Sequence, residues 1–211
     1  MYVPETFREK RIDELHALIE TNGFGMLLSP DAEDPVITHL PLLLERDRGP
    51  QGTLIGHVAR GNPHWRRLQE QPNVLAIFHG PHTYVSPSWY EEHPSVPTWN
   101  YAVVHARGRA RVMTDSEDLY SIVSRLVATY EGPRPSPWRM DLPEDYQRRM
   151  LSGIVGFEIE IVDLTGKFKL SQNRPAADQR RVIEALAQGA PAERETAALM
   201  ERAVLSKSGS L

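Results

Sequence analysis

The segment from Tyr101 to Met113 constrains the fold more than any other part of the sequence. Every second residue from Ala102 to Val112 is small or apolar, and the residues between them become basic at Arg107, Arg109 and Arg111. Strict alternation places the two sets of side chains on opposite faces of a strand. The segment therefore predicts one long strand with a buried apolar face and a basic face.

Shorter strand signals lie on both sides of that segment. Apolar or alternating runs cut by Pro, Gly, Asn and Asp predict strands near 25–29, 36–39, 42–45, 53–59, 74–79 and 83–86. The turn-rich run 47–52 predicts a hairpin connection between two of them. A further strand pair is predicted over 154–162 and 167–170, with a turn at 164–166.

Helical patterns surround these strands. The first is a helix whose apolar face holds Ile12, Leu15, Leu18 and Ile19 and which ends at Asn22-Gly23. Asp115 starts another, with a buried stripe of Leu119, Ile122, Val123, Leu126 and Val127. Residues 132–137 form a Pro-rich loop, residues 175–205 are helical in two pieces broken around 189–191, and the tail 206–211 is expected to fray.

These elements predict a mainly β protein with peripheral helices (α+β), built as a closed or nearly closed antiparallel barrel. A doubly wound parallel sheet is less consistent with the sequence, because regular strand–helix alternation and a Gly-x-Gly-x-x-Gly turn are both missing. We expect one barrel domain over residues 1–174 and a C-terminal helical appendage, 175–211, packed on the same domain.

Composition excludes several classes of protein. The chain has no Cys, which excludes disulfide frameworks, thiolate catalysis and Cys-ligated metal sites. Its longest apolar runs are far too short to span a bilayer, and it starts without a basic and apolar leader, so we expect no membrane association and a cytoplasmic location. The net charge of −4 gives no bulk attraction to nucleic acid. The spacing of the eight histidines predicts no metal site.

The run from Ile55 to Pro63 is the clearest candidate for an anion site. It brings His57 and Arg60 to the mouth of a helix for which Asn62 is the expected N-cap and Pro63 the first residue. The backbone N–H groups there favour an anion, and an arginine close to the cap is placed to hold phosphate. The alternative is that Arg60 only pairs with a surface carboxylate.

Four further clusters combine aromatic rings, amides and cations: Thr38–Pro41, Phe78–Tyr90, Val96–Tyr101 and Gly166–Arg174. Aromatic faces that cover a flat ring, amides that bond its edge and a cation that meets a phosphate are what a planar heterocycle with a phosphate tail requires. The alternative is that Trp89, Tyr90 and Trp99 are core or interface residues.

Together these segments resemble the FMN-binding negative transcriptional regulators of the PaiB type. The matching pieces are Met1–Pro4 with Phe7, Thr38–Pro41, Gly56–Pro63, Tyr84–Tyr90, Val96–Tyr101 and Lys169–Arg174. The resemblance implies a split β-barrel of the pyridoxamine-phosphate-oxidase and flavin-reductase type. It also implies a homodimer with FMN between its subunits, and a repressor of genes linked to sporulation and secreted proteases.

The resemblance also implies site residues. Arg60 and Asn62 would hold the phosphate, with Lys169, Ser171 and Arg174 as further phosphate or ribityl contacts. Thr38, His39 and Leu40 would line the ring. Trp99 and Asn100 would come from the partner subunit, Gln172 and Asn173 would bond polar ring edges, and His57 would contact ring or phosphate. No catalytic residue is assigned.

Two function classes stay open at this stage. The first is a flavin- or metabolite-responsive negative transcriptional regulator. No helix-turn-helix signature supports direct DNA binding, and the row of Arg107, Arg109 and Arg111 is more typical of a solvated strand face. The second class is a flavin-dependent oxidoreductase or a haem-handling split-barrel protein, so whether the chain is an enzyme is left open.

Overall fold

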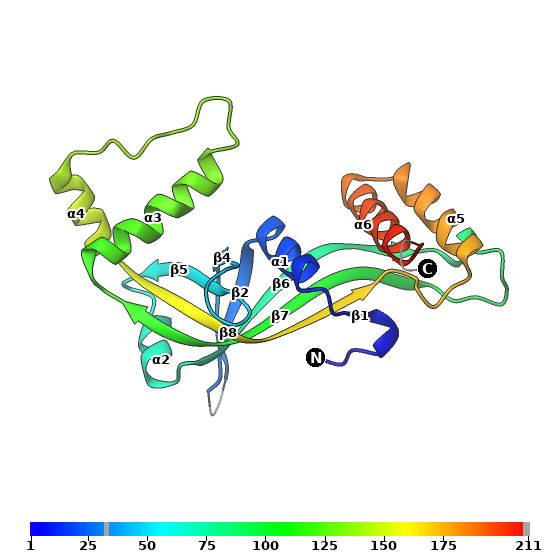
Figure 1. Cartoon of the computed structure of the whole chain (residues 1–211), viewed down its shortest axis with the longest axis horizontal. Coiled ribbons are helices and arrows are strands. Elements are labelled where there is room, and N and C mark those ends of the chain that lie inside the picture. Colours follow the sequence, from blue (N-terminus) through cyan, green and yellow to red (C-terminus); the bar gives the residue numbers. More distant parts are fainter. Residues whose placement is uncertain (32–33, 209–211) are drawn as a thin grey trace. The chain divides into compact units, whose positions relative to one another are not determined.

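The structure, a computed structural model, describes residues 1–31 and 34–208 and divides into two units. Unit 1 comprises Met1–Leu18, His79–Val104 and the chain from Thr165 onward, and unit 2 comprises Ile19–Phe78 and His105–Leu164. Four elements have residues in both units: α1 (Ile12–Thr21), β6 (Asn73–Val85), β7 (Thr98–Met113) and β8 (Ile154–Lys169). Figure 1 shows these three long strands with the shorter elements around them.

The described strands form one eight-stranded sheet in the order β3-β2-β6-β7-β8-β5-β4, with β1 (Arg8–Glu9) paired to β8. Every pairing with a known register is antiparallel. The other strands, all in unit 2, are β2 (Phe24–Ser29), β3 (Val36–Pro41), β4 (Leu43–Glu45) and β5 (Thr53–Ala59). Glu45 pairs with Thr53, which confirms the hairpin predicted at 47–52.

The helices of unit 2 are α2 (His64–Glu70), α3 (Ser116–Glu131) and α4 (Glu144–Ser152). Unit 1 contains the short 3₁₀ helices η1 (Glu5–Phe7) and η2 (Pro87–Trp89), together with α5 (Ala176–Ala187) and α6 (Pro191–Ser208). In Figure 1, α5 and α6 lie side by side, as predicted for a helix pair broken near Pro191. The frayed tail was expected over 206–211, but α6 runs through Ser208 and residues 209–211 lie outside the described part.

The long alternating strand is confirmed and begins earlier than predicted. Along β7 the small residues Ala102, Val104, Ala106, Gly108 and Ala110 are buried, and the three arginines are exposed. A Cβ at Gly108 would meet Ile159 Cγ2 of β8 at 2.5 Å, so this glycine permits close packing of the two strands. On α3 the side chain of Asp115 accepts from Glu117 N, and Leu119, Ile122 and Leu126 are buried as expected.

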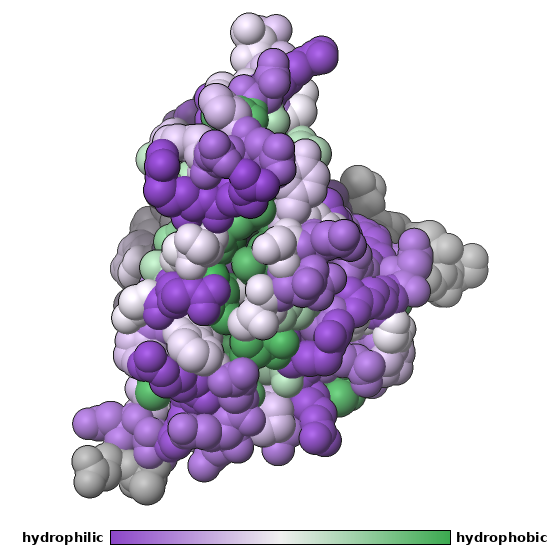
Figure 2. All heavy atoms as spheres, turned by 90° about the vertical axis from the view of Figure 1, so that its left-hand side faces the viewer, coloured by the Kyte–Doolittle hydropathy of each residue, from purple (hydrophilic) through white to green (hydrophobic). Residues whose placement is uncertain are grey.

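Hydrophilic side chains cover most of the face seen in Figure 2, which looks from the left-hand side of Figure 1, and hydrophobic ones form only a narrow band between them.

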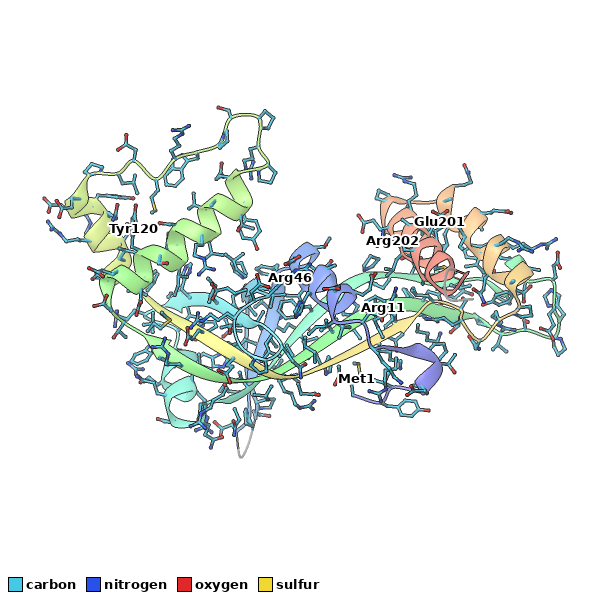
Figure 3. The ribbon with its side chains drawn as sticks, viewed as in Figure 1. Met1, Arg11, Arg46, Tyr120, Glu201 and Arg202 are labelled. Carbon is cyan, nitrogen blue, oxygen red and sulfur yellow. The ribbon has the colours of Figure 1, made fainter. Side chains whose placement is uncertain are left out.

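On unit 2, Arg46 follows β4 and donates two hydrogen bonds of 2.6 Å to the Glu20 carboxylate near the end of α1. Arg46 is labelled in Figure 3. This bidentate pair attaches the β4–β5 connection to the helix.

A chain of ion pairs also crosses unit 2, in the order Arg125–Glu45–Arg48–Glu158–Arg111. Glu45 bonds Arg48 at 2.8 Å and Glu158 bonds Arg111 at 2.7 Å, with direct Arg48–Glu158 and Arg125–Glu45 contacts completing the chain. Burial by itself would raise the pKa of Glu158, but hydrogen bonds from Arg111 and Arg48 outweigh it and lower that pKa.

Two predicted strand breaks are wrong. The strands predicted at 74–79 and 83–86 are one strand, β6, which ends at Val85. Those predicted at 154–162 and 167–170 are joined in β8, which runs through 164–166 and ends at Lys169. Gly166 was taken as part of a turn, and Gly80 lies in the gap predicted between residues 79 and 83, but each marks a close approach. A Cβ at Gly80 would meet Leu18 Cδ1 at 2.9 Å, and one at Gly166 would overlap Leu15 Cδ2.

Two further corrections concern short elements. Helix α4 was not predicted, although Pro143, the acidic pair Glu144-Asp145 and Gly153 are start and stop signals for it. Residues Arg8 and Glu9, expected within the first helix, form β1, because the helix begins only at Ile12. No helix among the described residues is long and apolar enough to cross a membrane.

Candidate functional site

In unit 2, two predicted site residues contact each other beside a buried histidine: Thr38, predicted at the ring, and Asn62, predicted at the phosphate. Thr38 Oγ1 lies 2.7 Å from His64 Nδ1, and Asn62 Nδ2 donates to the same hydroxyl oxygen at 3.3 Å. His64 Nε2 lies 2.9 Å from Ser29 Oγ. Both His64 and Ser29 are fully buried, and burial lowers the pKa of His64. We call these four residues the Thr38–His64 cluster.

Strand register explains why these side chains converge. Thr38 pairs with Leu27 and Val36 pairs with Ser29, so Thr38 and Ser29 point to the same face of the β2–β3 pair. Helix α2 packs against both strands. Its first residue is His64, one position later than predicted, and Asn62 Oδ1 accepts from His64 N at 3.0 Å, which is the capping bond expected of Asn62.

Arg60 is bonded to the end of α4. Its Nε donates to Ser152 O at 2.7 Å and its Nη2 donates to Ile154 O at 3.0 Å, while Arg60 N donates to Gly153 O at 2.8 Å. These carbonyls lie at the junction where α4 ends and β8 begins, so the exposed guanidinium caps the helix. Among the described residues, no carboxylate pairs with Arg60, although a surface carboxylate was considered as its alternative partner.

The remaining predicted residues of unit 2 differ in exposure. His39 is exposed and Leu40 is buried opposite Gly25. His57 is half-buried on β5, its Nδ1 has no hydrogen-bond partner among the described residues, and burial lowers its pKa. No hydrogen bond joins either histidine to the Thr38–His64 cluster in the described part of the chain.

In unit 1, Lys169 ends β8 beside the start of β7. Its ammonium donates to Trp99 O at 2.6 Å and also contacts the Thr98 hydroxyl. Burial lowers the pKa of Lys169, and the neighbouring Lys167 lowers it further. Both bonded oxygens are uncharged, and no carboxylate of the described residues pairs with this ammonium. Lys169 therefore carries a half-buried charge that has no counter-ion within the described chain.

Trp99, whose backbone carbonyl accepts from Lys169, belongs to an exposed pair of aromatic rings. Trp99 is 53% exposed and Tyr84 is 46% exposed, and their rings meet edge to face with centroids 6.2 Å apart. An exposed aromatic pair of this kind is suited to cover a flat heterocyclic ring.

The loop after Lys169 is held from within. Ser171 is buried with a φ of 64°, an unusual backbone conformation for a residue other than glycine, and Asn100 Nδ2 donates to its Oγ at 3.0 Å. The buried Asn100 amide also lies 3.3 Å from Met200 Sδ. The structure thus brings Asn100 and Ser171 together and directs both toward each other.

The other predicted residues of this loop are engaged locally. Gln172 Oε1 accepts from Leu170 N at 2.6 Å, and its Nε2 donates to Phe168 O. The Arg174 guanidinium lies 4.2 Å from the centroid of the Tyr90 ring, and its Nη1 donates to Ser95 Oγ at 3.3 Å. Asn173 is exposed.

The predicted site residues thus fall into two groups, one in each unit. Thr38 and Asn62 share a bond in unit 2, and Lys169 with Trp99 and Asn100 with Ser171 do so in unit 1. Sequence reasoning missed His64 and Ser29. His64 directly follows the motif Gly56–Pro63, so its place at the start of the predicted helix was the available signal.

Each group by itself offers donors that fit a part of FMN. The dianionic phosphate of FMN needs donors and cations, and the polar edge of its ring needs donors and acceptors. Lys169 presents an ammonium without a carboxylate partner, and Thr38 and Asn62 present a hydroxyl and an amide. At Gly61, between Arg60 and Asn62, a Cβ would meet no atom within 4 Å, so the backbone there is open.

Comparison with known proteins decides the family. Residues 1–163 match the model of a family described as "Putative FMN-binding domain". The chain belongs to this family. This membership confirms the resemblance found in the sequence, and FMN is the cofactor that the family's description names.

One relative by sequence and two solved structures match most of this chain. The chain is 37% identical over 203 residues to the Bacillus subtilis "Protease synthase and sporulation protein PAI 2", covering 95% of this chain and 97% of that protein. It is similar in structure to the FAD and heme binding protein of Mycobacterium smegmatis, with a TM-score of 0.60 and 15% sequence identity. The match covers 87% of this chain and 80% of that protein. It is also similar in structure to the flavocytochrome Anf3 of Azotobacter vinelandii, with a TM-score of 0.58 and 13% sequence identity. That match covers 79% of this chain and 72% of Anf3. These likenesses confirm the split-barrel fold.

Proposed function

We propose that this FMN-binding protein acts as a homodimeric negative transcriptional regulator that responds to flavin or to a metabolite. The observation that carries flavin binding is the half-buried Lys169 ammonium, which is bonded only to the uncharged oxygens of Thr98 and Trp99. Bound FMN supplies a ring that accepts one or two electrons. The ammonium of Lys169 would stabilise the negative charge of the bound ligand through a charge-assisted hydrogen bond.

The regulatory part of the proposal is supported by likeness to the sporulation protein of B. subtilis over almost the whole chain. Electrostatics favour an indirect mode of regulation. The net charge is −4, and the basic row of β7 is partly neutralised because Arg111 pairs with Glu158 at 2.7 Å and Arg107 lies 3.8 Å from Asp163. Protein–DNA affinity rests largely on unpaired cations that neutralise phosphates.

The proposed homodimer is supported by an apolar sheet face in unit 2. Ile37, Leu28 and Leu75 are cross-strand partners on β3, β2 and β6, and Met26 and Ile77 are partners in a neighbouring row of the same face. Ile37 is 48% exposed and Phe24, also on this face, is 69% exposed. A groove of about 480 Å³ lined by Leu28, Leu75 and Val162 adjoins it. An exposed apolar area of this kind is typical of protein interfaces.

The flavin part is tested by titrating the purified protein with FMN and following quenching of flavin fluorescence. We expect Lys169→Gln to weaken FMN binding by about tenfold to a hundredfold, the range for a charge-assisted hydrogen bond. Lys167→Gln, two residues away on the same strand, is the matched control and should change the affinity less than threefold. Equal effects of the two variants would contradict the role of Lys169.

The regulatory and dimer parts have their own tests. Binding to duplex DNA from the region upstream of the protein's own gene is measured at several salt concentrations, and we expect no salt-sensitive binding. Ile37→Glu should convert dimer to monomer in analytical ultracentrifugation, whereas Tyr120→Glu, on the exposed side of α3, should not. Tight DNA binding at low salt, or a wild-type monomer, would contradict the corresponding part. The cytoplasmic location and the 175–211 appendage stay predictions.

A further inference from the structure

We propose that His64 is a positioning residue that turns the Thr38 hydroxyl into a hydrogen-bond donor for the phosphate of FMN. The inference rests on the proposed flavin site. It assigns Thr38 to the phosphate and not to the ring, because Thr38 shares a hydrogen bond with Asn62, which the resemblance places at the phosphate. It depends on the direction of each hydrogen bond in the Thr38–His64 cluster, which can be derived from the donors and acceptors present.

The orientation of the Asn62 amide is fixed first. Its Oδ1 lies 3.0 Å from His64 N, and a backbone N–H can only donate, so Oδ1 is the acceptor and Nδ2 faces Thr38. An amide NH₂ group can only donate. One lone pair of Thr38 Oγ1 is therefore filled by Asn62, at 3.3 Å.

The second partner of the Thr38 hydroxyl is His64 Nδ1, at 2.7 Å. Two arrangements satisfy this contact. If the imidazole proton is on Nε2, it is donated to Ser29, and Nδ1 accepts the Thr38 proton. If the proton is on Nδ1, it is donated to Thr38, and the Ser29 hydroxyl donates to Nε2, 2.9 Å away. The fully buried Ser29 hydroxyl can act in either direction.

These two arrangements give Thr38 opposite properties toward a ligand. With the proton on Nε2, the Thr38 proton is used internally and the hydroxyl can only accept. With the proton on Nδ1, both lone pairs of Thr38 Oγ1 are filled by Asn62 and His64, and its O–H must point to another acceptor. A phosphate dianion offers only acceptors, so it selects the Nδ1-protonated form.

The cluster is built to hold this arrangement. His64 and Ser29 are fully buried, and Thr38 is half-buried, so it is the member of this hydrogen-bonded set that a ligand can reach. Burial also lowers the pKa of His64, which keeps the ring neutral near pH 7 and makes the choice one between two tautomers. His64 has no need to touch the flavin to determine how Thr38 binds it.

The tautomer is read directly by ¹⁵N NMR of histidine-labelled protein at pH 7.5, with and without FMN. His64 should have its proton on Nδ1 in the FMN-loaded protein, and a proton on Nε2 in that state would overturn the proposal. This measurement needs no variant to fold, and wild-type FMN binding in the same sample tests the proposed flavin function separately.

Ligand selectivity provides the second test, with FMN and riboflavin as the two probes. Thr38→Val should weaken FMN binding about tenfold to a hundredfold and riboflavin binding less than threefold, because only FMN carries the phosphate. Equal weakening of both ligands, or of neither, would overturn the phosphate contact.

Two substitutions of His64 separate positioning from packing. His64→Asn keeps an amide at the place of Nδ1 and should preserve the preference for FMN over riboflavin to within about threefold. His64→Gln places its amide toward Ser29 and should lose that preference. His64→Asn removes more volume than His64→Gln, so packing alone would make the Asn variant the worse of the two, whereas the proposal predicts the opposite order. A loss of selectivity in both variants at equal thermal stability, or a greater loss in His64→Asn, would overturn the assignment.

Discussion

Replacing Arg60 tests whether the exposed guanidinium stabilises the fold, binds the ligand, or does both. Its Nε and Nη2 donate to the carbonyls of Ser152 and Ile154 at 2.7 and 3.0 Å. Hydrogen bonds to charged groups contribute about 1.5–3 kcal/mol each where they are shielded, and less where they are exposed. We therefore expect Arg60→Ala to lower the free energy of unfolding by about 1–3 kcal/mol.

The assay is urea unfolding followed by circular dichroism, together with FMN titration of the same samples. A loss of about 1–3 kcal/mol corresponds to a drop in Tm of about 2–12 °C for a chain of this size. Arg60→Lys should give an intermediate value, because one ammonium cannot reproduce the two-pronged geometry. Arg180→Ala, an exposed arginine on α5, is the matched control.

The two measurements separate the two roles of Arg60. If the guanidinium also binds phosphate, as the sequence predicts, FMN affinity falls by a further tenfold to a hundredfold. If it only caps α4, affinity stays unchanged while stability falls. A free energy of unfolding within about 0.3 kcal/mol of the Arg180→Ala control would refute the capping role.

Three further predictions concern stability. Gly61→Ala should stabilise the protein by about 0.4–1 kcal/mol, because a Cβ there meets no atom within 4 Å. Gly108→Ala should destabilise it by about 1–3 kcal/mol, because its Cβ would overlap the Glu160 carbonyl, and similar melting temperatures for the two variants would contradict this. Ser171→Gly should be about 1 kcal/mol more stable than Ser171→Ala in urea unfolding, since only glycine relieves the φ of 64°, and the reverse order would contradict the strain. Because the folded-state pKa of Glu158 is lowered, its contribution is present above the unfolded-state pKa and is lost as the pH falls below about 4.5; Glu158→Gln should flatten the fall of stability in acid, and an unchanged slope would argue against it.

Local patterns predicted much of the secondary structure, because side-chain periodicity and capping act within a few residues. The alternation along β7 and the Asp115 cap of α3 were both recognisable in the sequence. Gly166 was wrongly taken as part of a turn, and Gly80 lies in the other gap that was wrongly predicted between strands. A glycine signals either a turn or a close approach, and only the packed neighbour, a leucine of α1 in both cases, distinguishes the two.

The family motifs indicated which residues to examine, but they did not give the partners of those residues. Arg60 bonds a carbonyl 92 positions away, and Lys169 bonds one 70 positions away. Contacts at such separations depend on strand register and on how a helix packs, which no short window of sequence contains. His64 is an example, because its two ring nitrogens contact Thr38 and Ser29, which lie 26 and 35 positions away in the sequence.

By itself, then, the sequence determined the order and type of most elements, the family, and FMN as the cofactor. The tertiary structure decided which side chains share hydrogen bonds: Thr38 with His64 and Asn62, and Lys169 with Thr98 and Trp99. The physical reason is that periodicity is a local property of the chain. The direction and partner of a hydrogen bond are instead set by residues that only the folded backbone brings within 3 Å or so of one another.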